Sequence, residues 1–178
     1  MNFKDLLKEI EQSESFKQFK EQHSDAELIA GFFILDFKDK REESTIDYKS
    51  GDKIYTFTIS NEGLFSFKEE NILDKTRPLN KLNSDIKVDA VNLKAKVEQA
   101  FKDNKITGNL EKIIAVLQEM SISGNGDPSR ENLVSHTIWN LTCMVEGMKI
   151  ILIHIDAITG EVIKCEKRSL FDFARPSK

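Results

Sequence analysis

The sequence predicts an α+β protein made of two units, each a helical segment followed by an antiparallel meander of strands. Three observations support this prediction. Residues 3–22 and 89–104 place apolar side chains at helical spacing. Each is followed by short segments rich in strand-forming residues, several of which alternate between apolar and polar. Glycine-containing turns separate these segments at similar distances in both halves.

In the first half, residues 3–22 carry an apolar stripe, and a serine near 13–15 is expected to cap a second helix. Residues 26–38 are rich in Ile, Leu and Phe and contain few polar positions. They predict a strand covered on both faces. The expected strands that follow are 44–49, 53–60 and 64–69.

In the second half, Asp89 is expected to cap a helix over 89–104, and Gly108 to end it. The apolar stripe of this helix contains Leu93, Val97 and Phe101. The expected strands are 111–120, 132–145, 149–156 and 161–167. The first of these strands is ambiguous, because its apolar residues also fit the spacing of a helix.

These segments suggest a division into units 1–70 and 89–170, a polar linker 71–88 and a tail 171–178. One helix covers only one face of a sheet, so the other face of the strand at 26–38 needs a second cover. We therefore expect either that the two sheets pack on each other or that the chain forms a homodimer through Phe32 and Ile34.

Composition excludes several classes of protein. The 178 residues are 39% hydrophobic and 31% charged, and the net charge of −4 is spread along the chain, so a nucleic-acid partner is not expected. The first residues lack the apolar core of a signal peptide, and no apolar run is long enough to span a membrane. The expected location is cytoplasmic, with Cys143 and Cys165 as reduced thiols.

No motif indicates an enzyme, a metal site or a cofactor. Two histidines and two cysteines scattered over strands fall short of a zinc site. The sequence shows no glycine-rich nucleotide motif, nucleophile elbow or carboxylate pair. Catalytic groups need not be adjacent in sequence, so the lack of such motifs does not exclude an enzyme, but the sequence gives no reason to expect one.

The last expected hairpin, "IHIDAITGEVIKCEK" (153–167), follows a helix and a meander, and this arrangement resembles the PepSY domain, a cystatin-like α+β module. The resemblance is best over 89–167, with a weaker second copy over 15–69. It implies a binding or inhibitory module without catalytic residues. Within the hairpin, Asp156 and Thr159 are expected to hydrogen-bond the turn backbone, and Gly160 to adopt positive φ.

We therefore predict a non-catalytic module that binds a protein or peptide partner. The alternative is a small-molecule-binding protein or enzyme with a pocket between sheet and helix. The candidate contact residues come from strand 132–145, from the next strand, 149–156, and from the loop before 132–145. Strand 132–145 places Trp139 on its core face and polar groups on the other face. The loop before it contains glycines and a proline, which favour unusual backbone conformations. The candidates are His136, Asn140, His154, Asp127 and Arg130.

Overall fold

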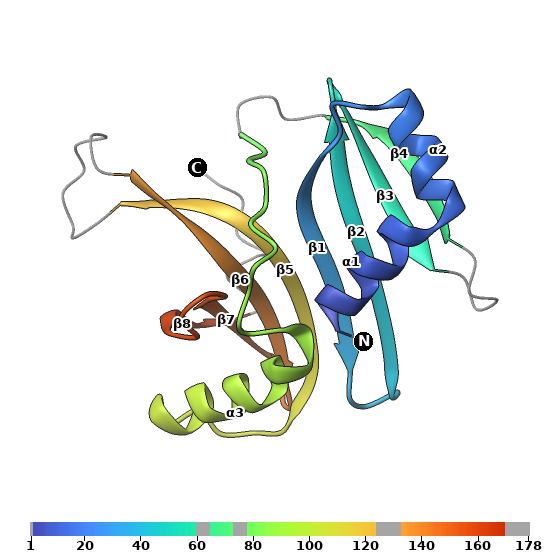
Figure 1. Cartoon of the computed structure of the whole chain (residues 1–178). Helices are drawn as coiled ribbons and strands as arrows, with labels where there is room; N and C mark the ends of the chain where they lie inside the picture. Colours follow the sequence, from blue (N-terminus) through green and yellow to red (C-terminus); the bar gives the residue numbers. More distant parts are fainter. Residues whose placement is uncertain (1, 60–64, 73–77, 124–132, 170–178) are drawn as a thin grey trace, which may run out of the picture.

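The computed structural model describes residues 2–59, 65–72, 78–123 and 133–169, and within them the main feature is an eight-stranded antiparallel sheet (Figure 1). The strand order is β4-β3-β2-β1-β5-β6-β7-β8. The strands are β1 (Glu27–Asp36), β2 (Arg41–Ser50), β3 (Lys53–Ile59), β4 (Phe65–Asn71), β5 (Leu110–Ser123), β6 (Leu133–Val145), β7 (Lys149–Asp156) and β8 (Val162–Ser169).

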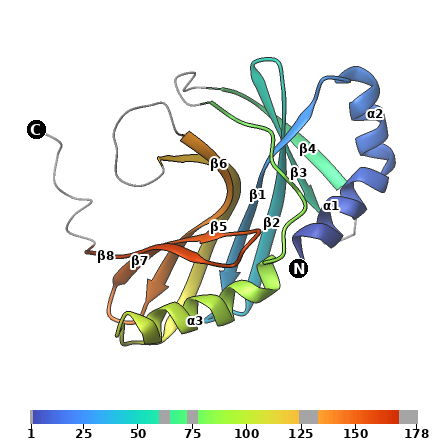
Figure 2. The same ribbon diagram turned by 60° about the vertical axis from the view of Figure 1, so that its left-hand side comes forward.

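The helices lie in two groups, one for each half of the sheet. Helices α1 (Phe3–Gln12) and α2 (Glu14–Gln22) lie against β1–β4, and α3 (Leu93–Asp103), preceded by the short 3₁₀ turn η1 (Ala90–Asn92), lies against β5–β8 (Figures 1 and 2). The expected serine cap is confirmed, because the Oγ of Ser13 accepts a hydrogen bond of 3.1 Å from the backbone N–H of Phe16.

The hydrophobic core lies between these helices and one face of the sheet. The register places Phe33, Ala115, Leu141 and Ile153 side by side on four neighbouring strands, and all four are buried. The helices contribute fully buried residues to the same cluster, among them Phe3, Leu6, Ile10, Leu93 and Val97. Core residues of both halves therefore form one continuous cluster.

Asp89 joins the two halves at the edge of this core. Its Oδ1 accepts 2.6 Å hydrogen bonds from the backbone N–H groups of both Phe3 and Ala90. The first is the start of α1 and the second the start of η1, so one carboxylate caps two helical segments. Nearby, the indole N–H of Trp139 donates to the carbonyl of Val88 at 2.7 Å, and this ties the approach to α3 to strand β6.

The prediction of two helix-plus-meander units with separate sheets is wrong, and so is the face-to-face packing of two sheets. Strand β1 pairs with β5 from Ala30–Gln118 to Asp36–Lys112, which makes all eight strands one sheet. Strand accounts for far more of the structure than the three short α-helices do. Periodicity within a segment shows which residues share a face, but it does not show which distant strands pair.

The predictions for individual segments were more accurate than the prediction of how they combine. The segment 111–120, which also fitted a helix, is a strand paired on both sides, to β1 and to β6. Its apolar residues belong to two faces: Ile113 and Leu117 are fully buried in the core, whereas Ile114 lies on the opposite face. Trp139 is fully buried on the core face, as its alternating neighbours predicted.

Candidate functional site

The sheet face opposite the core carries no helix among the described residues, and the register gathers apolar side chains at its centre. One row across β1, β5, β6 and β7 is formed by Phe32, Val116, Asn140 and His154. The adjacent row, in the same strand order, is formed by Ile34, Ile114, Thr142 and Leu152. We call these eight residues the open-face grid.

The apolar members of the open-face grid stand apart from the hydrophobic core. All eight grid residues are half-buried, and none belongs to the core cluster or packs against it. Exposure on this face changes along β6: Ile138 is fully buried, whereas Met144 is 37% exposed. The accessible part of the face therefore extends from the grid towards Met144.

Two of the predicted contact residues meet in this grid. Asn140 and His154 are directly opposite each other in the β6–β7 ladder. Burial lowers the pKa of His154 and the nearby Lys164 lowers it further, although Glu166 acts in the opposite direction. The imidazole is therefore held neutral at pH 7, in a form suited to an apolar surface.

Asp47 on β2 adds a buried carboxyl group to the same face, beside Ala30. Its Oδ1 is buried and lacks a hydrogen-bond partner. Burial raises the pKa of this carboxyl group, a hydrogen bond with Thr56 opposes the rise, and the charge of Glu70 reinforces it. A carboxylate in this environment destabilises the fold at neutral pH, which is more typical of functional surfaces than of packing.

His136 lies at the end of the face rather than in the grid. It pairs with Met120 across the ladder, and its Nδ1 lies 3.0 Å from Oδ2 of Asp156. The other carboxylate oxygen of Asp156 accepts the backbone N–H groups of Ile158 and Thr159 at 2.9 and 2.8 Å. The contact thus orients the histidine against a turn.

The motif in this turn is explained by its hydrogen bonds. The Oγ1 of Thr159 accepts from the N–H of Glu161, and Gly160 has a φ of 79°. Burial alone raises the pKa of Asp156, but the backbone N–H of Thr159, the contact with His136 and the N–H of Ile158 together hold it below its usual value. The expected turn role of these residues is confirmed.

The cleft that contains His136 is shallow. It has a volume of about 480 Å³ and is lined largely by polar side chains, among them Asn83, Glu119 and Thr137, but not by Asn140 or His154. Glu119 accepts hydrogen bonds from the hydroxyl groups of Ser135 and Thr137. The three predicted polar residues of β6 and β7 therefore do not converge on one pocket.

The other predicted residues and groups add no chemistry to this site. Asp127 and Arg130 lie outside the described residues. Both cysteines are free, and burial raises the pKa of Cys143 to about 12 and that of Cys165 as well, so neither is a thiolate at neutral pH. Within the described ranges, no three His, Cys, Asp or Glu side chains gather as metal ligands would.

Residues that the sequence did not single out complete the open-face grid, namely Val116, Ile114 and Leu152. Their signal was present in the alternation of each strand, because they have the opposite parity to the buried Ala115 and Ile153. What was missing was the pairing that puts them beside Phe32 and Asn140.

Comparisons with known proteins concern the fold alone. No protein-family model matches the chain, and neither does any curated protein. The fold is similar to the crystal structure of a protein from Clostridium difficile 630 described as a putative lipoprotein, with a TM-score of 0.51 and 18% identity, covering 89% of this chain and 97% of that one. The resemblance to the PepSY domain stays a prediction.

The described residues also contain no helix that is long and apolar enough to cross a membrane.

Proposed function

We propose that the protein is a non-catalytic binding module that receives a protein or peptide partner on the open-face grid. The observation that carries this proposal is the pairing register, which brings five apolar side chains together outside the core: Phe32, Ile34, Ile114, Val116 and Leu152. Apolar groups clustered on one surface gain free energy when a partner removes them from water.

The polar members of the grid fit the same role. Asn140, Thr142 and His154 lie beside the apolar group, where their side chains can donate and accept hydrogen bonds at the rim of an interface. Across four strands spaced about 4.8 Å apart, the grid is roughly 14 Å wide. This size matches the compact centre of an interface, where a few side chains supply most of the binding energy.

A pocket for a small substrate is less well supported on this face. Ligand pockets are concave and bring a few polar groups together around an apolar volume. Here the cleft beside His136 is shallow and leaves out Asn140 and His154. The two histidines are also differently engaged, since His136 contacts Asp156 and His154 faces Asn140.

A photo-cross-linking amino acid at position 32 tests the proposal. Benzoylphenylalanine replaces an aromatic residue by a larger aromatic one, and Phe67, 42% exposed on the edge strand β4, provides the matched control position. After irradiation in native extract, position 32 is expected to give adducts of discrete mass and position 67 is not. An adduct of twice the chain mass would identify the partner as a second copy.

A second variant links the adduct to the grid. Ile114→Asp places a charge between Ile34 and Thr142 in the register and is expected to abolish the adducts at position 32. Circular dichroism checks that this variant stays folded, and Ser66→Asp on β4 serves as a charge-matched control. Adducts that survive Ile114→Asp, or equal yields at positions 32 and 67, would overturn the proposal.

A further inference from the structure

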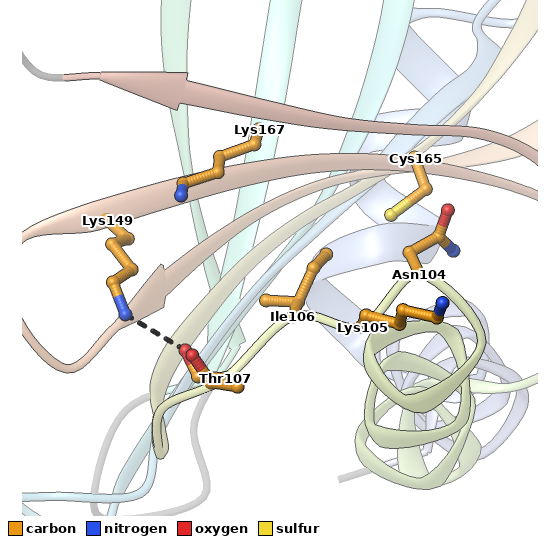
Figure 3. Close-up of a pocket in the computed structure, with 7 residues that line it drawn as sticks. All are labelled: Asn104, Lys105, Ile106, Thr107, Lys149, Cys165 and Lys167. Atoms are coloured by element: carbon orange, nitrogen blue, oxygen red, sulfur yellow. Dashed lines mark hydrogen bonds between the residues drawn. The ribbon is translucent and has the colours of Figure 1, made fainter.

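A second site lies on the opposite side of the sheet, where α3 ends. The segment after this helix, the start of β7 and the end of β8 enclose a cleft of about 250 Å³, lined by Asn104, Lys105, Ile106, Thr107, Lys149, Cys165 and Lys167 (Figure 3). Three of these seven residues are lysines and none is acidic. The protein as a whole carries a net charge of −4, so this concentration of positive charge is local.

These three lysines differ from most strand lysines in the described part of the chain. Lys53, Lys68 and Lys164, for example, form ion pairs with Glu69, Glu70 and Glu166. Among the described residues, none of Lys105, Lys149 and Lys167 has a carboxylate partner. Within the described part of the chain, their positive charges are therefore not neutralised.

The sheet register brings two of these cations close to each other. Lys167 pairs with Ile151, which lies two residues after Lys149 on β7, so the two lysines are diagonal neighbours on one face. Diagonal neighbours in an antiparallel ladder lie about 7–8 Å apart, close enough for like charges to repel. An anion bound between them would remove this repulsion.

The position of Lys149 is fixed by the backbone around it. Its ammonium group donates a hydrogen bond of 3.0 Å to the carbonyl of Thr107, which leaves two further N–H groups available. The next residue, Gly108, has a φ of 117°, and a Cβ there would lie 2.9 Å from a methyl group of Val145, so the backbone beside this carbonyl requires glycine. The ammonium group is therefore held in place before any ligand arrives.

The volume of the cleft and the arrangement of its lining residues limit the kind of ligand. Figure 3 shows Lys149 and Lys167 on one side of Ile106 and Lys105 on the other, with the thiol of Cys165 directed towards the cleft. A volume of about 250 Å³ admits a small molecule or a single head group rather than a polymer. Lysine ammonium groups bind phosphate as point charges, and a doubly charged phosphate gains most from two of them.

We propose that this cleft binds a phosphate monoester group, with Lys149 and Lys167 as its main contacts and Lys105 at its rim. The group belongs either to a small soluble molecule or to a lipid head group. The site is independent of the open-face grid, because its residues lie on the core side of the sheet or in the segment after α3.

Calorimetric titration with inorganic phosphate and with glycerol phosphate, against chloride at equal ionic strength, tests the proposal on the full chain. Saturable binding to the wild type is expected, and Lys149→Gln combined with Lys167→Gln is expected to weaken it by about tenfold or more. Lys164→Gln is the matched control, because it removes a strand β8 lysine from the other face and is expected to leave affinity within about twofold.

Vesicles distinguish the two sources of the phosphate group. Phosphatidylcholine vesicles with phosphatidic acid are compared with vesicles of phosphatidylcholine alone. Binding to free phosphate only assigns the site to a soluble ligand, and vesicle binding that depends on Lys149 and Lys167 assigns it to a head group. The proposal fails if the protein binds neither the soluble phosphates more tightly than chloride nor the phosphatidic acid vesicles more tightly than phosphatidylcholine vesicles. It also fails if Lys164→Gln weakens binding as much as the double variant.

Discussion

The two halves of the sheet cover their core face with different chemistry. In β1–β4 the cover is aromatic: Phe19 contacts four aromatic rings of the strands, including Phe57 on β3 and Phe67 on the edge strand β4, at centroid distances of 5.0–6.2 Å. In β5–β8 it is mainly aliphatic, and the edge strand β8 presents Cys165 and Lys167 to the same side. The edge strand of the first half therefore joins an aromatic cluster, whereas that of the second half also carries a charged side chain on its core side.

The length of the helices explains this difference. Helices α1 and α2 together contribute 10 and 9 residues to the first half, whereas α3 contributes 11 to the second. One helix covers fewer strands than two, and the space beyond the last turn of α3 becomes the cleft lined by Lys149 and Lys167. An incomplete cover thus creates room for a ligand beside β7 and β8.

The largest effect is expected from a substitution in the aromatic cover of the first half. Phe19→Ala removes a 1% exposed ring and is expected to lower the free energy of unfolding by about 3–5 kcal/mol. Urea denaturation followed by fluorescence of Trp139, which lies in the other half, measures it. Because the core is continuous, the Trp139 signal is expected to shift as far as the circular dichroism signal. Separate transitions would show that the halves unfold independently.

The next prediction concerns the joint between the halves. Asp89→Ala leaves the N–H groups of Phe3 and Ala90 without their acceptor and is expected to cost about 2–3 kcal/mol. Asp89→Asn keeps one acceptor oxygen and is expected to cost about half as much. Thermal unfolding of both variants measures the difference. Equal losses would mean that the negative charge matters rather than the caps.

Removing the charge of Asp47 is expected to stabilise the protein. Its folded-state pKa is raised, so the native state binds more protons than the unfolded state above the ordinary value of 3.8, and stability falls as the pH rises through that window. Asp47→Asn is expected to raise the free energy of unfolding at pH 7 by about 1 kcal/mol. Chemical denaturation between pH 4 and 7 measures both the gain and its loss in acid.

Asp156, in the other half, provides the opposite control. Its pKa is lowered, so its contribution is present above the ordinary value of 3.8 and is lost as the pH falls through the folded-state pKa. Asp156→Asn is expected to destabilise the protein at pH 7 and to flatten its loss of stability in acid. If both variants changed stability in the same direction, the assignment of the two environments would be wrong.

The smallest expected effect comes from two lysines in left-handed backbone conformations. Lys40 in the β1–β2 turn and Lys105 after α3 have φ values of 52° and 53°, where glycine is less strained. Replacing either by glycine is expected to raise stability by about 0.5 kcal/mol. Only Lys105→Gly is expected to weaken phosphate binding, by a few fold, as calorimetry would show. Equal binding by both variants would remove Lys105 from the site.

Local sequence determined the elements of this protein and the faces of its strands. Alternation in 132–145 put Trp139 in the core and Asn140 on the other face, because successive side chains of a strand point in opposite directions. The serine cap at Ser13 and the turn around Asp156 followed from short-range hydrogen bonds that these side chains make with their own backbone. Such features need no distant partner.

Only the tertiary structure decided how the elements combine. The pairing of β1 with β5 joined what the sequence presented as two units, and the choice of strand partner depends on contacts between residues about 80 positions apart. The same holds for Asp89, which the sequence assigned to its own helix but which also caps α1. The open-face grid and the lysine cleft both arise from this long-range register, because strand alternation fixes a side chain's face but not its neighbours.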